Sequence, residues 1–117
     1  MKRVEKPWGH ELIWAHTDRY VGKLLHIQQG HQLSRQYHEV KDETILVIEG
    51  ELVLELGAED SLERRVLGKM ESYRVTPGTI HRFIAEHDVT LMEISTPELD
   101  DVVRLEDDYG REGTSAP

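Results

Sequence analysis

The strongest constraint on the fold of this chain is a series of short segments that have the composition of β-strands and are separated by turn-forming residues. The segments are rich in β-branched, aromatic or alternating apolar residues, as strands are. Glycine, proline or aspartate stands between most of them, at intervals of roughly eight to twelve residues. We expect strands at residues 11–14, 20–28, 44–50, 51–57, 72–76, 81–85 and 89–95. Helical periodicity is not seen, so the chain is predicted to be all-β, an antiparallel sandwich or barrel.

The length of 117 residues suits one domain with one core. Two apolar runs meet at Glu49-Gly50-Glu51, which predicts a β-hairpin turning at Gly50. The chain becomes strongly acidic after residue 97, and its last six residues, EGTSAP, have the composition of a disordered tail. We therefore expect one domain over residues 1–111 and a disordered tail over 112–117.

Composition excludes several classes of function. The chain has 14 Lys and Arg against 23 Asp and Glu, a net charge of −9, so nucleic-acid binding is not expected. A local group of basic residues can still hold a small phosphorylated molecule. No apolar run approaches the roughly 18 residues that span a bilayer, and no apolar stretch follows the basic start. Cysteine is absent, which excludes disulfides and thiolate ligands. We expect a cytoplasmic protein without membrane contact.

Residues 36–43 have the spacing of a metal site. Gln36 and His38 are two residues apart, so their side chains share a face of a strand. Glu43 is five residues beyond His38 and would face away if the strand continued unbroken. A bend at Lys41-Asp42 can return it to the same cavity. These three side chains are therefore candidate ligands.

A fourth candidate ligand is His81, which follows a turn at residues 77–80 and begins a predicted strand. Two imidazoles, one carboxylate and one amide oxygen suit a borderline divalent cation, with positions left open for water or substrate. Zinc is the first choice, and manganese, cobalt, nickel and iron(II) are compatible with the same ligands. A single carboxylate ligand also keeps the cation a strong Lewis acid.

The same residues resemble the motifs of the cupin superfamily. The first motif, G-x5-H-x-H-x(3,4)-E-x6-G, is matched at every spacing, with glutamine in place of the first histidine. The second motif, roughly G-x5-P-x-G-x2-H-x3-N, is matched in part, by Gly78 and His81. The residues that match the first motif are Gly30, Gln36, His38, Glu43 and Gly50. The resemblance implies a small cupin, a double-stranded β-helix or jelly-roll barrel, and cupins often pair as homodimers.

A narrower resemblance extends over almost the whole chain. It is to the C-terminal cupin domain of type II mannose-6-phosphate isomerases. It rests on PWG at residues 7–9, on Ser34, on the four candidate ligands and on RLEDDYGR at 104–111. In that family a glutamine at the position of Gln36 binds the metal. Lys41 replaces the family's arginine, keeping the charge but losing the bidentate fork, and Thr44-Ile45 replaces its His-Trp.

This resemblance implies interconversion of mannose 6-phosphate and fructose 6-phosphate, with a phosphorylated sugar as the small-molecule partner. The proton between C1 and C2 needs a base, for which Lys41, Glu93 and a water on the metal are candidates. Alternation along the strand does not decide which face of the sheet Glu93 occupies. Candidate phosphate contacts are Lys23, Lys41, Arg82 and Arg104.

Two other functions are compatible with these residues. One is a cupin that holds a metal and a sugar or other metabolite without turnover, which the replacement at Lys41 favours. The other is a cupin dioxygenase. The weak amide ligand at Gln36 favours Lewis-acid chemistry over the iron site of those enzymes.

Overall fold

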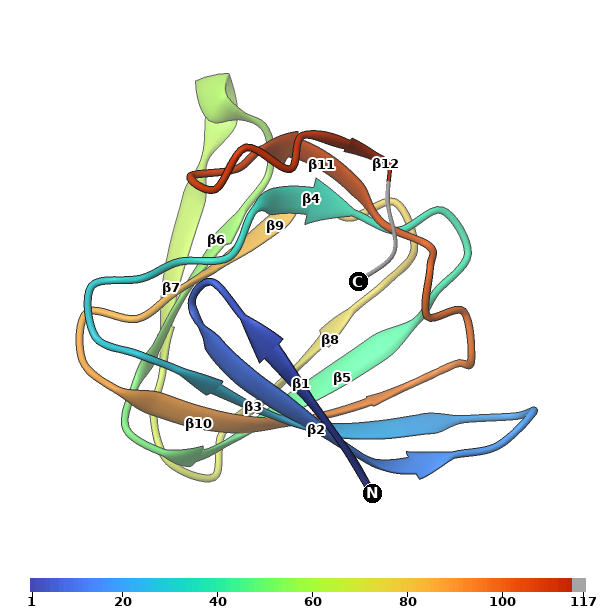
Figure 1. Cartoon of the computed structure of the whole chain (residues 1–117). Coiled ribbons are helices and arrows are strands. Elements are labelled where there is room, and N and C mark those ends of the chain that lie inside the picture. The colour runs from blue at the N-terminus through green and yellow to red at the C-terminus, as the bar shows by residue number, and fades with distance from the viewer. Residues whose placement is uncertain (115–117) are drawn as a thin grey trace.

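Two six-stranded antiparallel sheets face each other in the computed structural model, which describes residues 1–114 (Figure 1). The first sheet has the order β1 (Lys2–Lys6), β2 (Gly9–His16), β3 (Val21–Ile27), β10 (Val89–Ser95), β5 (Glu43–Glu49) and β8 (Ser72–Val75). The second has the order β12 (Gly113–Thr114), β11 (Val103–Glu106), β4 (Arg35–Tyr37), β9 (His81–Ile84), β6 (Leu52–Leu56) and β7 (Glu63–Leu67). A 3-10 turn, Glu59–Ser61, precedes β7. The predicted all-β jelly-roll barrel is confirmed.

All seven of the strands listed above are present, and five further strands occur, of which only β4 was anticipated, as the strand that carries Gln36. The additional strands are β1, β4, β7, β11 and β12. They are short or carry several charges, so their local sequence is a weak strand signal. Strand β12 pairs with β11 and includes two residues of the tail that we expected to be disordered. The rest of that tail, 115–117, lies outside the described residues. Within residues 1–114 we find no helix with the length and apolar character needed to cross a membrane.

The predicted hairpin at Gly50 is wrong. Strand β5 pairs with β10 and β8, whereas β6 pairs with β7 and β9 in the other sheet. The chain therefore crosses between the two sheets at this glycine. A glycine between two apolar runs marks a sharp change of direction in either case, and only long-range pairing decides which sheet the second run joins.

Gly50 is required at this crossing. Its φ is +82°, and a Cβ built on it would lie 2.4 Å from the Asp88 carbonyl oxygen. Gly30 has a similar φ of +83° but open space around the same position. We expect Gly30→Ala to cost about 1–2 kcal/mol of unfolding free energy, from backbone strain alone. Gly50→Ala adds a steric clash and should cost about 1–3 kcal/mol more. Urea denaturation of both variants checks this, and equal midpoints would contradict it.

The inward faces of the sheets change character along the strands. On β10, Val89 and Leu91 are buried in the hydrophobic core, and Glu93 and Ser95 continue the same face. On β5, the buried Val47 follows Ile45 and Glu43 on one face. One end of the barrel is thus packed with hydrocarbon, and the other is lined by buried polar groups. This polar end holds the candidate site.

Candidate metal centre

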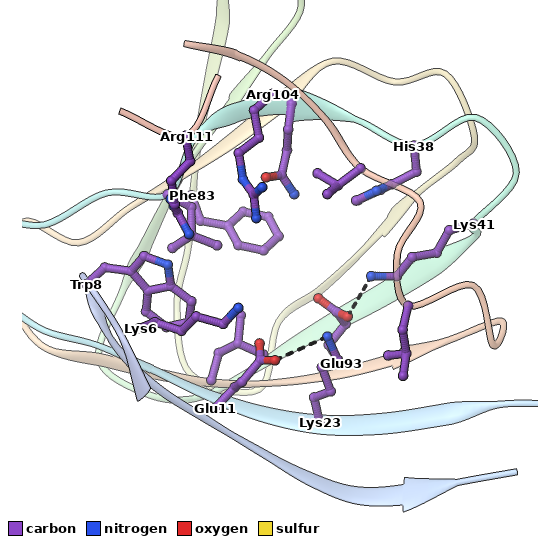
Figure 2. A pocket seen from close by; sticks show the side chains of 15 residues that line it. Lys6, Trp8, Glu11, Lys23, His38, Lys41, Phe83, Glu93, Arg104 and Arg111 are labelled. Carbon is purple, nitrogen blue, oxygen red and sulfur yellow. Dashed lines mark ion pairs between the residues drawn. The ribbon is translucent and has the colours of Figure 1, made fainter. Parts of the chain in front are cut away.

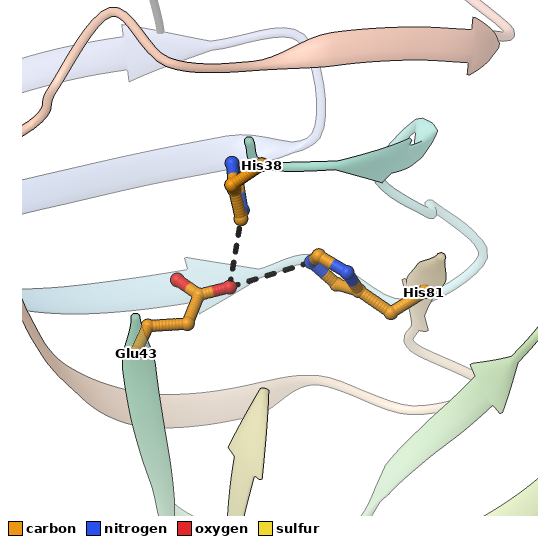
Figure 3. A group of neighbouring side chains, drawn as sticks. All are labelled: His38, Glu43 and His81. Carbon is orange, nitrogen blue, oxygen red and sulfur yellow. Dashed lines mark hydrogen bonds and ion pairs between the residues drawn. The ribbon is translucent and has the colours of Figure 1, made fainter. Parts of the chain in front are cut away.

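Three of the four predicted ligands meet inside the polar end of the barrel. His38 follows β4, Glu43 begins β5 and His81 begins β9, and each side chain is 3% exposed or less. Glu43 Oε1 lies 3.2 Å from His38 Nε2 and 3.3 Å from His81 Nε2 (Figure 3). The candidate donor atoms all lie within 4.8 Å of one another. The bend after His38 does return Glu43 to the side of His38.

Backbone carbonyls fix the orientation of both imidazole rings. His38 Nδ1 donates to the Asp101 carbonyl oxygen at 2.6 Å, and His81 Nδ1 donates to that of Thr79 at 2.9 Å. Since a carbonyl oxygen only accepts, each Nδ1 carries a proton, and each ring turns its Nε2 toward Glu43. Within residues 1–114, His81 Nε2 has no hydrogen-bond partner.

Three possible metal-ligand atoms therefore converge on one buried region. Burial alone would raise the pKa of Glu43, but Lys41, His38 and His81 hold it well below its ordinary value, so the carboxylate is charged. Imidazole nitrogens and a carboxylate are the ligands of zinc and similar cations. The residues present fit a divalent metal.

Gln36 lies beside this group. It is paired with His81 on β9 and with Arg104 on β11, so these residues form a row across three neighbouring strands. Paired residues of antiparallel strands direct their side chains to the same face. The Gln36 side chain lines the same cavity as His38, and its amide oxygen accepts a hydrogen bond from Ser34. Its role as a fourth ligand stays a prediction.

Lys41 and Glu93 are buried next to the candidate ligands. Lys41 Nζ lies 3.4 Å from Glu43 Oε2 and 3.2 Å from Glu93 Oε2. Burial would lower the pKa of Lys41, but the two carboxylates outweigh it and raise the pKa above its ordinary value. Burial, followed by repulsion from Glu43, raises the pKa of Glu93. Glu93 faces the cavity, which alternation alone left undecided, and Lys41 is held there as a cation.

The two predicted phosphate contacts Lys23 and Arg104 also line the cavity, but Arg82 does not (Figure 2). Arg82 follows His81 on β9 and points to the opposite face of the sheet. There its Nε donates to the Leu33 carbonyl oxygen at 2.8 Å, and its Nη2 lies 3.1 Å from Asp108 Oδ1. Arg82 therefore has a structural position outside the site.

Four polar residues that we did not predict belong to the cavity or its support. They are Lys6, Glu11, Asp101 and Arg111. Glu11 forms a buried ion pair with Lys23 at 3.5 Å. Alternation in GHELIWAH could have placed Glu11 on the buried face. The local sequence around Lys6, Asp101 and Arg111 does not place them at the site, because pairing between distant strands brings them there.

Asp101 anchors the segment that carries His38. Its carboxylate accepts hydrogen bonds from the backbone N–H groups of Glu39, Val40 and Lys41, at 2.7–3.0 Å. These bonds hold the Asp101 carbonyl against His38. We expect Asp101→Ala to weaken zinc affinity by about 10- to 100-fold, the usual effect of losing a group that orients a ligand.

The measurement is a competition titration with a chromophoric chelator. The control is Asp100→Ala, which removes an exposed carboxylate from the neighbouring position. Equal zinc affinity in the two variants would show that the anchor does not support the site.

Comparisons with known proteins identify the family of this chain. The family described as "Cupin domain" matches residues 23–96. Mannose-1-phosphate guanylyltransferase ManC of Salmonella typhimurium is 32% identical over 115 residues, and the corresponding Escherichia coli enzyme is 31% identical. Each match covers 94% of this chain, but the chain spans only 23% of either relative.

Solved structures with the same fold have lower sequence identity. KdgF from a Halomonas species is 22% identical with a TM-score of 0.71, covering 83% of this chain and 88% of its own. The capsular polysaccharide assembling protein CapF of Staphylococcus aureus is 18% identical with a TM-score of 0.78, covering 90% of this chain and 31% of its own. At these identities the likeness concerns the fold.

Proposed function

This chain belongs to the cupin domain family, and from that premise we propose that it is a metal-dependent aldose–ketose isomerase of sugar phosphates, of the mannose-6-phosphate isomerase type. The observation that carries the proposal is that a candidate metal centre and the buried carboxylate of Glu93 face one cavity. A Lewis acid and a proton-transfer group are the two parts that this isomerisation requires.

His38, Glu43, His81 and Gln36 would hold the cation. Bound there, a divalent metal supplies positive charge that stabilises negative charge on neighbouring carbonyl and hydroxyl oxygens. Lys41 keeps Glu43 and Glu93 together through its two ion pairs. Its ammonium adds positive charge on the same side of the cavity.

Glu93 is the proposed proton carrier. In the forward direction its carboxylate takes the proton from C2 of the aldose and returns a proton to C1, while the hydroxyl proton passes from O2 to O1. The carbonyl moves from C1 to C2, and atoms and electrons balance without an oxidant. Lys41, the other candidate residue, is less suited because two carboxylates stabilise its protonated form.

Two curated relatives support a phosphorylated sugar as the substrate. Their names give mannose 1-phosphate as the compound on which those whole enzymes act. The match to them falls within a region that is 23% of their length, so it supports a sugar-phosphate ligand without fixing the reaction.

The test is conversion of mannose 6-phosphate to fructose 6-phosphate by zinc-loaded protein. We expect turnover that is lost with a chelator and regained with zinc. Metal-dependent binding of the sugar without turnover would replace the proposal with a non-catalytic binding module. Oxygen uptake with iron(II) and no isomerisation would replace it with a dioxygenase.

We also propose a cytoplasmic homodimer. Trp14 and Ile94 are 42% and 49% exposed on the outer face of the first sheet. Both adjoin Gly22, since Ile94 pairs with it and the Trp14 ring packs against it. An exposed apolar patch of this kind suits a contact with a second copy. Light scattering after size exclusion measures the mass, and a monomer at micromolar concentration would contradict the dimer.

A further inference from the structure

Two histidines lie side by side on the outer face of the first sheet. His10 on β2 pairs directly with His26 on β3, and both side chains are only partly buried. Residues that oppose each other in an antiparallel pair have Cβ atoms roughly 4.5–5.5 Å apart on the same face. The next pair in the register, Glu11 and Leu25, lines the cavity. Because side chains alternate along a strand, the histidines lie on the face away from the candidate metal centre.

The two imidazoles are spaced as ligands of one cation are. Their ring centres are 5.5 Å apart, with 28° between the ring planes. The corresponding distance between His38 and His81 is 5.2 Å. With a zinc–nitrogen distance of about 2.0–2.1 Å, two imidazoles on one tetrahedral cation have ring centres roughly 5 Å apart. A small rotation of these partly exposed rings is therefore enough to bring both to one cation.

Thr90 orients one of the rings. It lies opposite His26 on β10, and its Oγ1 is hydrogen-bonded to His26 Nδ1 at 2.9 Å. With Nδ1 occupied by the hydroxyl, Nε2 is the nitrogen that remains for a cation. Metal-binding histidines commonly have such a hydrogen bond on the other ring nitrogen, which fixes the orientation of the ring.

His10 is in the protonation state that a metal ligand needs. Partial burial, followed by Arg3 and His26, lowers its pKa, although Glu5 on the opposing strand β1 raises it. The ring is therefore neutral near pH 7, and neutral imidazole is the form that binds metals. Two protonated rings at this spacing would repel each other, whereas a shared cation would be bound by both.

We propose that His10 and His26 form a second divalent-cation site, on the outer face of the first sheet. Imidazole nitrogens suit zinc, copper and nickel, and two protein ligands leave positions for water. The site has fewer protein ligands than the candidate metal centre, so we expect it to bind zinc more weakly. It goes beyond the proposed function and does not depend on it, because neither histidine lines the cavity.

Calorimetric titration of metal-free protein with zinc tests this site. We expect two equivalents per chain, one tight and one weaker. His10→Ala and His26→Ala should each weaken the second equivalent by at least roughly 10- to 100-fold, since loss of a ligand costs no less than loss of a group that orients one. The matched control is His16→Ala, which removes an exposed imidazole from the same strand as His10 and should leave both equivalents unchanged. A second equivalent that is absent from the parent, or unchanged in either variant, would overturn the proposal.

A double variant separates one shared cation from two independent surface imidazoles. If one cation uses both rings, His10→Ala combined with His26→Ala should lose little more affinity than either change alone. Additive losses would mean that each ring binds by itself, and would overturn the site.

His81→Ala separates this site from the candidate metal centre. We expect this variant to lose the tight equivalent and keep the weaker one, and loss of both would overturn the second site. A parent protein whose only zinc equivalent is the one that His10→Ala removes would overturn the candidate metal centre and the proposed function, but would support the site at His10 and His26.

Discussion

Glu93→Gln is expected to lower kcat by about 10²- to 10⁴-fold, the range associated with loss of a general base. The amide has nearly the shape of the carboxylate but cannot take up the C2 proton. Lys41 retains its ion pair with Glu43, so the candidate ligands keep their positions. Zinc content should therefore equal that of the parent, and KM should change much less than kcat. Steady-state kinetics with mannose 6-phosphate, together with metal analysis, measure both effects.

The control for this variant is Glu51→Gln, which makes the same chemical change at an exposed position between β5 and β6. Its kcat should equal that of the parent. A Glu93→Gln protein that melts normally, binds zinc and keeps more than a tenth of kcat would show that another group carries the proton.

His81→Ala is expected to abolish zinc binding at the candidate metal centre. The substitution removes a ring whose Nε2 lies 3.3 Å from Glu43 and whose other nitrogen is already bound to a carbonyl. Affinity should fall by more than the roughly 10- to 100-fold that follows loss of an orienting group. Isomerase activity should be lost with the metal. Competition with a chromophoric chelator measures the affinity, and metal analysis after dialysis measures the content.

The matched control is His87→Ala, which removes an exposed imidazole from the turn before β10. Gln36→Ala should have a smaller effect than His81→Ala, because a neutral amide oxygen is a weaker ligand than imidazole. Zinc affinity equal to the parent's in the His81 variant would exclude this histidine as a ligand.

The candidate metal centre was predictable because its members are close in sequence or follow a marked turn. His38 and Glu43 belong to one motif, and the bend between them has a local signal. Arg82 was misplaced because neighbouring residues of a strand face opposite sides, and once His81 faces the cavity Arg82 must face away. The alternation of side chains along a strand could have placed Arg82 on the face opposite to His81 from the sequence alone.

The basic residues that line the cavity were only partly predictable. Lys23 and Arg104 were expected at the site, but Lys6 and Arg111 were not. Lys6 lies there because β1 pairs with β2, and Arg111 because β11 pairs with β4. Pairings between distant segments have no local signature, and the same reason explains the incorrect hairpin at Gly50.

The bond from His38 to the Asp101 carbonyl has a consequence for biosynthesis. All four candidate ligands are contained in the first 81 residues, but the ring of His38 is oriented by a residue 63 positions further along the chain. A ribosome-bound chain that has emerged only as far as residue 81 therefore contains all four candidate ligands but lacks the carbonyl group that orients His38. High-affinity metal uptake should begin only after residue 101 has emerged, which makes it one of the last steps in maturation of the nascent protein.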